Sequence, residues 1–158
     1  MAQPEAHPDN AGVLIFPPLL LAICAVLAIL IGWLAPAAAI PAMPSYLLAA
    51  ICVASGLALD RWAQRSLRRA QTAVHPSEAT IAIVNTGAFG LSRNPIYLAQ
   101  GILLAAVCFL VRNGWCFFAL LPWLLVIRYG VIAREERYLL RKFGEPYARY
   151  LGEVRRWV

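Results

Sequence analysis

The sequence predicts an all-α integral membrane protein: a single domain, residues 1–158, with about four transmembrane helices and an amphipathic cytoplasmic tail. Hydrophobic residues make up 61% of the chain and charged residues only 14%, against about 45–50% and about 25% in ordinary globular proteins. The apolar residues gather in runs long enough to cross a bilayer. The basic residues adjoin these runs, so the formal charge of +6 indicates contact with anionic lipid and argues against nucleic-acid binding.

The first two predicted helices form the N-terminal half of the bundle. Residues 13–34 are an apolar run that can cross about 30 Å of hydrocarbon at about 1.5 Å per residue. Residues 35–44 contain three prolines and no charge, which predicts a short extracytoplasmic turn. The second helix is predicted over residues 45–65, with Arg61 and Arg65 reaching back to the membrane interface.

The loop over residues 66–94 is predicted to be cytoplasmic. From Asp60 to Arg93 the chain carries five arginines and two acids, and an excess of basic residues marks the cytoplasmic side. Two more helices are predicted over residues 95–111 and 115–133, and the break between them indicates a tight hairpin on the opposite side. The tail, residues 134–158, is again basic, so four spans leave both termini in the cytoplasm.

The end of the cytoplasmic loop has the features of an anion site. Gly87 and Gly90 permit backbone angles that other residues resist. Asn94 is a favoured N-cap residue and Pro95 a favoured first helical residue, so we expect a helix to begin there. Free backbone N–H groups and the cation of Arg93 then meet at one place, which suits an anionic group.

Glu135 and Glu136 follow the fourth predicted span. Neither acid has a basic residue three or four positions away, so we expect a cationic partner from elsewhere in the fold or from a ligand. The alternative is a solvated cluster of interfacial charges. Adjacent side chains on a helix point about 100° apart, which predicts that only one of the two faces a ligand directly.

Two other sets of residues in the apolar runs have simpler interpretations. Arg128 lies inside the fourth span, so it either faces the bundle interior, where Glu135 is a possible partner, or reaches the interface. The four cysteines lie in or beside apolar runs without a C-x-x-C spacing, which favours small core residues over a metal site; they are Cys24, Cys52, Cys108 and Cys116.

The tail is predicted to form two short helices. The first ends at Gly144, and Pro146 opens the second, on which Tyr147 and Tyr150 recur at helical spacing. Together with Arg156, this makes a basic amphipathic segment that lies at the interface or covers the bundle. A membrane anchor and a lid over a cofactor both explain it.

Several short motifs together resemble the superfamily of isoprenylcysteine carboxyl methyltransferases and phospholipid N-methyltransferases, in particular its bacterial branch. They are Thr86-Gly87-Ala88-Phe89, Ser92-Arg93-Asn94-Pro95-Ile96-Tyr97-Leu98, Glu135-Glu136-Arg137 and Phe143-Gly144-x-x-Tyr147-x-x-Tyr150. This resemblance implies a membrane methyltransferase that uses S-adenosylmethionine and acts on an isoprenylcysteine carboxylate or a lipid. It also implies a bacterial inner membrane as the location.

The resemblance further implies which residues bind the cofactor, whose carboxylate suits Arg93 and whose ammonium and sulfonium suit the two acids. The implied cofactor-binding residues are Arg93, Asn94, Pro95, Tyr97, Leu98, Glu135, Glu136, Tyr147, Tyr150 and Arg156. Arg93, Asn94 and Glu135 are the implied catalytic residues. Asn94 stands where the family has a histidine, and an amide cannot act as a base near neutral pH.

Two alternatives stand beside this interpretation. One is a sterol-reductase-like membrane enzyme that uses NADPH, for which the chain is short and carries no glycine-rich dinucleotide fingerprint. The other is a non-catalytic membrane accessory protein whose charged tail docks a partner or lipid. The expected partners are a lipophilic methyl acceptor and membrane lipid, with no nucleic acid and no metal.

Overall fold

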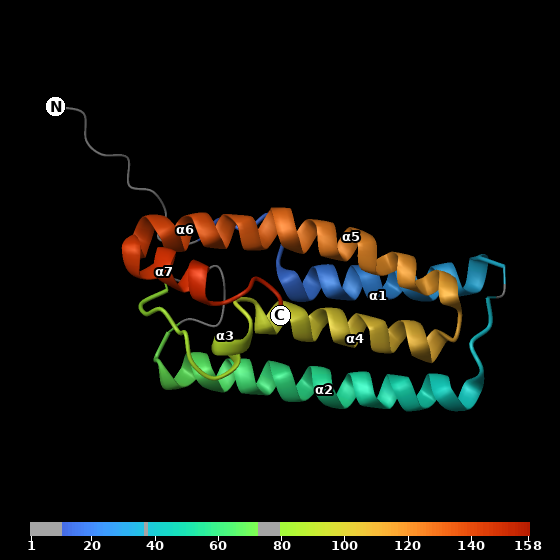
Figure 1. Cartoon of the computed structure of the whole chain (residues 1–158). Coiled ribbons are helices and arrows are strands. Elements are labelled where there is room, and N and C mark those ends of the chain that lie inside the picture. Colours follow the sequence, from blue (N-terminus) through green and yellow to red (C-terminus); the bar gives the residue numbers. More distant parts are fainter. Residues whose placement is uncertain (1–10, 37, 73–79) are drawn as a thin grey trace.

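The computed structural model describes residues 11–36, 38–72 and 80–158. Its helices form an antiparallel bundle in which α1 (Pro17–Leu34), α2 (Ala42–Arg69) and α4 (Pro95–Val111) lie beside a fourth, longer helical rod (Figure 1). The all-α prediction is confirmed. We call the end that carries α3 (Ala88–Leu91) and the C-terminal residues the site end, and the opposite end the turn end.

The first two helices differ from their predicted bounds at prolines. α1 begins at Pro17, not at residue 13, because the pair of prolines fits only the first helical turn. α2 begins at Ala42 and runs for 28 residues to Arg69, so the predicted bounds of 45–65 are too narrow at both ends. Pro44 lies in its first turn, where no intrahelical N–H is required. Arg68 and Arg69 lie in its last turn, where their positive charges interact favourably with the negative end of the helix dipole.

α4 has the predicted bounds and ends in a two-residue turn. Arg112 takes the left-handed conformation with φ of +58°, and the oxygen of Asn113 accepts from the Trp115 N–H at 3.1 Å. The chain segment before α2 pairs with this turn, because Ile40 N donates to Arg112 O and Gly114 N to Ala38 O, both at 3.0 Å. The predicted tight hairpin is therefore confirmed and closes the turn end.

The fourth rod is a continuous run of four helical segments, which corrects the prediction of a span over 115–133 followed by a tail. The rod comprises the 3₁₀-helix η1 (Gly114–Ala119), α5 (Leu120–Leu125), the π-helix η2 (Val126–Ile132) and α6 (Ala133–Phe143). It ends at Gly144, whose φ of +60° favours glycine. α7 (Glu145–Glu153) follows, as the tail pattern predicted.

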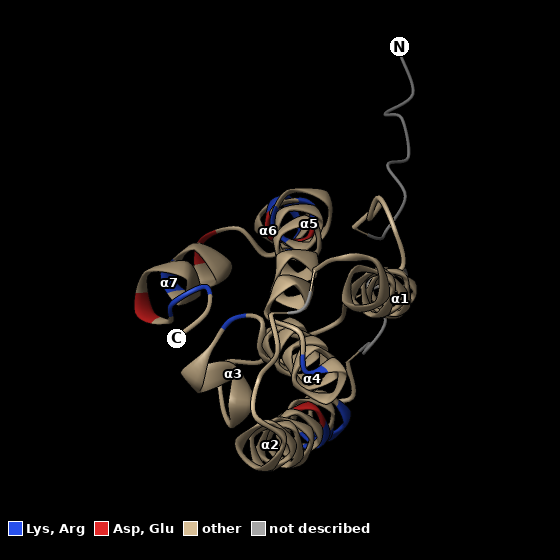
Figure 2. Ribbon diagram, turned by 90° about the vertical axis from the view of Figure 1, so that its right-hand side faces the viewer, with Lys and Arg blue, Asp and Glu red and all other residues tan. Residues whose placement is uncertain are grey.

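The bundle packs around α4, which lies between α1, α2 and the fourth rod when viewed along the axis (Figure 2). Small residues permit this packing. A Cβ atom on Gly101 would lie only 2.9 Å from the Trp123 ring, so a larger residue there would clash. Cys24, Cys108 and Cys116 are buried, free thiols and Cys52 is half-buried, in agreement with their predicted role as small packing residues.

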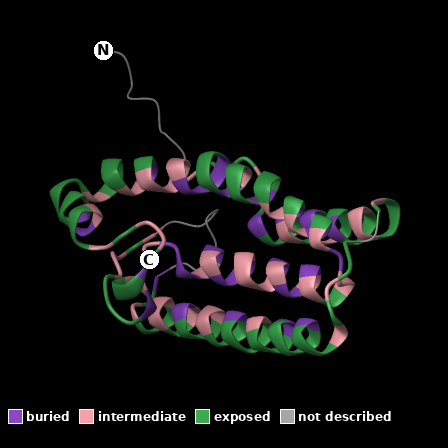
Figure 3. Ribbon diagram, turned by 45° about the vertical axis from the view of Figure 1, so that its right-hand side comes forward, coloured by how far each residue is buried: buried purple, intermediate pink, exposed green. Residues whose placement is uncertain are grey.

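The outside of the bundle is apolar, and buried residues face inward from every helix (Figure 3). Within the described residues, three helical stretches are long and apolar enough to cross a membrane: Pro17–Leu34, Ala42–Arg69 and Gly114–Phe143. α4 is apolar and has 17 residues, so it measures about 25 Å at about 1.5 Å per residue. Four helices of these lengths make the chain an integral membrane protein.

Candidate active site

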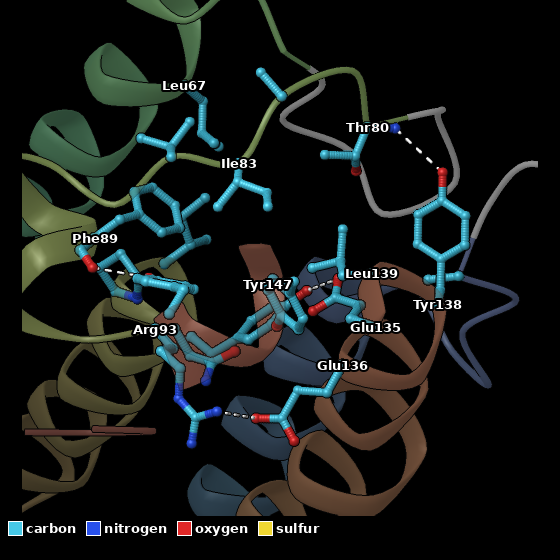
Figure 4. A pocket seen from close by; sticks show the side chains of 18 residues that line it. Leu67, Thr80, Ile83, Phe89, Arg93, Glu135, Glu136, Tyr138, Leu139 and Tyr147 are labelled. Carbon is cyan, nitrogen blue, oxygen red and sulfur yellow. Dashed lines mark hydrogen bonds and ion pairs between the residues drawn. The ribbon is translucent and has the colours of Figure 1, made fainter. Parts of the chain in front are cut away.

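A pocket at the site end lies between α2, the loop over residues 80–94, the start of α4, α6 and α7 (Figure 4). Its empty space is about 880 Å³ with the open mouth included. One wall is apolar and contains Leu67, Ile83 and Phe89. The opposite wall carries charges and hydroxyls from Arg93, Tyr97, Glu135, Glu136, Tyr147 and Tyr150.

Two arginines bind Glu136. Arg93 Nη1 lies 3.3 Å from its Oε1, while Arg156 donates from Nη2 to Oε2 at 2.6 Å and from Nε to Oε1 at 3.1 Å. The Glu136 and Arg93 side chains are only 16% and 13% exposed, so this is not a solvated surface cluster. The prediction of a cationic partner from elsewhere in the fold is confirmed. The hydrogen bond to Glu136 raises the pKa of Arg156, and its burial opposes this.

Glu135 has a neutral partner. Its Oε1 accepts from the Tyr97 hydroxyl at 2.7 Å, and within the described part of the chain its Oε2 has no hydrogen-bond partner. A carboxylate held this way complements a cationic ligand group better than an anionic one.

Both acids line the same pocket, and the expectation that only one of them faces a ligand directly stays a prediction. The two acids lie in the first turn of α6 and have different partners. Tyr97 of α4 binds Glu135, and the two arginines bind Glu136. The π-helix η2 precedes this turn, and Ala133 N donates to Arg128 O, five residues back. Such wider turns rotate the residues that follow and are frequent at functional sites.

Asn94 does not cap α4, which corrects the capping prediction, although Pro95 starts the helix as expected. Its Nδ2 donates instead to the Arg156 carbonyl at 2.9 Å. Its own N–H donates to Ser92 Oγ at 3.1 Å. The polar groups of Asn94 thus connect the loop to the C-terminal residues.

Tyr147 and Tyr150 of α7 cover the pocket, as a lid would. Tyr150 donates its hydroxyl proton to the Phe89 carbonyl at 2.8 Å. Burial raises the pKa of Tyr150 to about 12, against the opposing effect of Arg93. Burial, and next the charge of Glu136, raise the pKa of Tyr147 as well. Both phenols therefore stay protonated at neutral pH, and Tyr150 acts as a neutral donor.

Not every residue implied by the resemblance reaches the pocket. Leu98 is half-buried on α4 and is absent from the pocket wall, and Arg156 acts on the site through Glu136. Arg128 is exposed and stacks on the Tyr129 ring at 5.5 Å, not on Glu135. The bundle-interior alternative with Glu135 as partner is therefore wrong for Arg128, and the interfacial alternative stays a prediction.

Sequence reasoning missed the wall formed by residues 80–84. Thr72 Oγ1 accepts from Ile81 N at 3.1 Å and from Ala82 N at 3.4 Å, and Thr80 N donates to the Tyr138 hydroxyl at 3.4 Å. The signal was an apolar run from residue 81 to residue 84 inside a loop predicted to be polar. Residues 73–79 of that predicted loop, and residues 1–10 before the first helix, lie outside the described residues.

A membrane bundle with a cavity of mixed charge at one end is typical of an enzyme that acts on lipophilic molecules at the bilayer surface. Residues 44–146 match the family model described as phospholipid methyltransferase. That match covers more than half of the chain, so the chain belongs to this family. It is a membrane methyltransferase of the phospholipid and isoprenylcysteine type, which confirms the resemblance found in the sequence.

One curated relative supplies a further comparison. A protein of Haemophilus influenzae, described as uncharacterized, is 40% identical over 63 residues, which are 40% of this chain and 100% of that protein. No solved structure matches the chain significantly.

Proposed function

We propose that the chain uses S-adenosylmethionine and transfers its methyl group to a lipophilic acceptor, either an isoprenylcysteine carboxylate or a membrane lipid. The observation that carries this proposal is the meeting of one arginine and two carboxylates in a pocket whose other wall is apolar. A phosphate or another purely anionic ligand would be repelled by the acids, whereas a ligand with both an anionic and a cationic end satisfies both kinds of group.

The unpaired polar atoms of the pocket support the fit of this cofactor. Among the described residues, Arg93 Nε is buried and has no hydrogen-bond partner, and Glu135 Oε2 has none either. Arg93 would hold the carboxylate of the methionine part, and Glu135 its ammonium. Tyr97 would orient Glu135, and Tyr147 and Tyr150 would cover the ligand from α7.

When bound, S-adenosylmethionine would supply a methyl group activated by its sulfonium. The acceptor would attack the methyl carbon in line with the S–CH₃ bond, and S-adenosylhomocysteine would leave as the neutral thioether. The protein then mainly aligns the two reactants and excludes water, for which the apolar wall of Leu67, Ile83 and Phe89 is suited. An acceptor carboxylate or thiolate needs no base. An acceptor amine would pass its proton to a carboxylate, and Glu135 is the candidate.

The orientation follows from the charges. Arginine and lysine gather on α6, α7 and the last turns of α2 at the site end, so we infer that this end faces the cytoplasm of a bacterial inner membrane. The acceptor is then a molecule of the inner leaflet or one anchored to it.

Transfer of a labelled methyl group from S-adenosylmethionine into a whole membrane lipid extract tests the proposal, with Glu135→Gln as the matched variant. We expect a labelled lipophilic product with the wild-type protein and its loss with the variant. Titrations with S-adenosylhomocysteine and NADPH distinguish the alternatives. Binding of NADPH alone would support the reductase, and binding of neither by a folded protein would support an accessory role.

A further inference from the structure

We propose that Asn94 and Ser92 are positioning residues that hold the C-terminal strap, residues 154–158, beside the pocket and thereby place Arg156 on Glu136. This inference rests on the proposed function for its effect on ligand affinity. The contacts that hold the strap are formed within the protein and do not depend on any ligand.

Three hydrogen bonds join the strap to the loop that precedes α4. Arg93 N donates to Arg155 O at 3.0 Å. The Arg156 carbonyl accepts twice, from Asn94 Nδ2 at 2.9 Å and from Ser92 Oγ at 3.3 Å. Ser92 is fully buried and Asn94 is 8% exposed, so these bonds are shielded from competing water and losing one leaves an unsatisfied buried group.

The hydrogen bonds of Asn94 indicate that its side chain holds the strap and does not cap α4. An asparagine at a helix start ordinarily accepts a hydrogen bond from an N–H group of the first turn, which stabilises the helix. Asn94 makes no such bond and instead reaches a carbonyl 62 residues away. Ser92 Oγ also accepts from the Asn94 N–H at 3.1 Å, so the two side chains form one connected buried network.

Arg156 is therefore held at two points. Its carbonyl is fixed by the loop, while its guanidinium makes two hydrogen bonds to Glu136, the shorter being 2.6 Å. Trp157, the next residue, packs against the core cluster that contains Tyr97. The strap thus links the loop, the core and α6 at the site.

The strap determines how much of Arg93 is available to a ligand. Glu136 is shared between Arg93, at 3.3 Å, and Arg156, at 2.6 Å. If the strap detached, Arg156 would leave and Glu136 would be neutralised by Arg93 alone, drawing that cation away from a bound carboxylate. Loosening the strap should weaken cofactor binding and change the rate of transfer little.

Asn94→Asp is the most informative variant, because a carboxylate of nearly the same shape cannot donate to the Arg156 carbonyl. Ser92→Ala is the second variant, which removes the longer bond and keeps the protein testable if the first fails to fold. Asn113→Ala is the matched control: Asn113 is 6% exposed, and its Nδ2 donates to Gly32 O at 3.3 Å, at the turn end.

Two measurements are required in detergent: trypsin cleavage after Arg155 and Arg156, followed by mass spectrometry, and binding of S-adenosylhomocysteine by calorimetry. We expect Asn94→Asp to accelerate cleavage in the strap and to weaken binding about three- to tenfold, the effect of one buried hydrogen bond. The KM for S-adenosylmethionine should rise in parallel while kcat changes less than about twofold. Asn113→Ala should change neither cleavage nor binding.

Weaker binding with unchanged cleavage would overturn the inference, because Asn94 would then act directly on the ligand. Unchanged values in both measurements would overturn it as well. If the wild-type protein bound no S-adenosylhomocysteine, the proposed function would fail, while faster cleavage in Asn94→Asp would still support the strap and unchanged cleavage would refute it.

Discussion

The dipeptide Arg-Asn occurs at both ends of α4, and its two copies do different work. At the turn end, Arg112 donates to Ile40 O at 3.3 Å and stacks over the Tyr46 ring, and Asn113 caps η1. At the site end, Arg93 meets the carboxylate of Glu136, and Asn94 leaves its helix uncapped to bind the strap.

This comparison shows how the site end, which carries the candidate site, differs from the turn end, which closes the bundle. At the turn end, side chains bond to neutral backbone groups: the Ile40 and Gly32 carbonyls, which are distant in the sequence, and the Trp115 N–H. At the site end, charges are partly buried, Arg93 Nε has no partner among the residues described, and the cap is absent. Stabilising contacts are given up where binding groups are needed.

Exchanging each arginine for alanine should show the largest contrast. Arg93→Ala removes the cation that we propose binds the cofactor carboxylate and leaves Glu136 with Arg156 alone. We expect the affinity for S-adenosylhomocysteine to fall about 100-fold, near the upper limit for a hydrogen bond to a charged group. Arg112→Ala should leave affinity unchanged in the same calorimetric titration. Equal losses in both variants would mean that the effect is structural.

Glu135→Gln tests the other end of the ligand. The amide keeps the shape and can still accept from Tyr97, but it loses the negative charge. We expect about 10- to 30-fold weaker binding of S-adenosylhomocysteine. Glu145→Gln is the control, because its ion pair with Arg149 lies at the surface, with side chains 84% and 70% exposed, and contributes little. Tight binding by Glu135→Gln would remove Glu135 from the site.

We expect the smallest contrast between the two asparagine variants, and we expect it in hydrogen exchange at the helix starts. Asn113→Ala removes a cap, so we expect faster hydrogen exchange at the Trp115 N–H and a loss of about 1 kcal/mol in the free energy of unfolding. Asn94→Ala removes no cap, so exchange at the Ile96 and Tyr97 amides should stay as in the wild type. Acceleration at those two amides would show that Asn94 does cap α4.

Much of the fold could be predicted because its causes are local. Pro95 and the turn at Arg112 bound α4 correctly, and Gly144 ended the fourth rod as its backbone freedom requires. The same local reasoning failed at Asn94, since the capping preference describes the helix start alone. The partner that outcompetes the cap belongs to residue 156, which no pattern around residue 94 contains.

The candidate site shows the same division. The absence of local partners correctly indicated a distant cationic partner for Glu136, whereas Glu135 is bonded to the neutral hydroxyl of Tyr97. It did not indicate that both arginines bind Glu136 or that the Tyr97 hydroxyl donates to Glu135. The π-helix before the acids was also invisible, because its apolar residues suit an α-helix equally well.

The apolar spans, the breaks between them and the side on which charge gathers can be predicted from the sequence alone. They follow from hydropathy, proline and glycine, which act over a few residues and against lipid. Which polar groups meet depends on the packing of the helices, since partners such as Tyr97 and Glu135 are 38 residues apart in the chain. Their meeting depends on how the helices pack, and a turn of one helix by a single residue would change every pair.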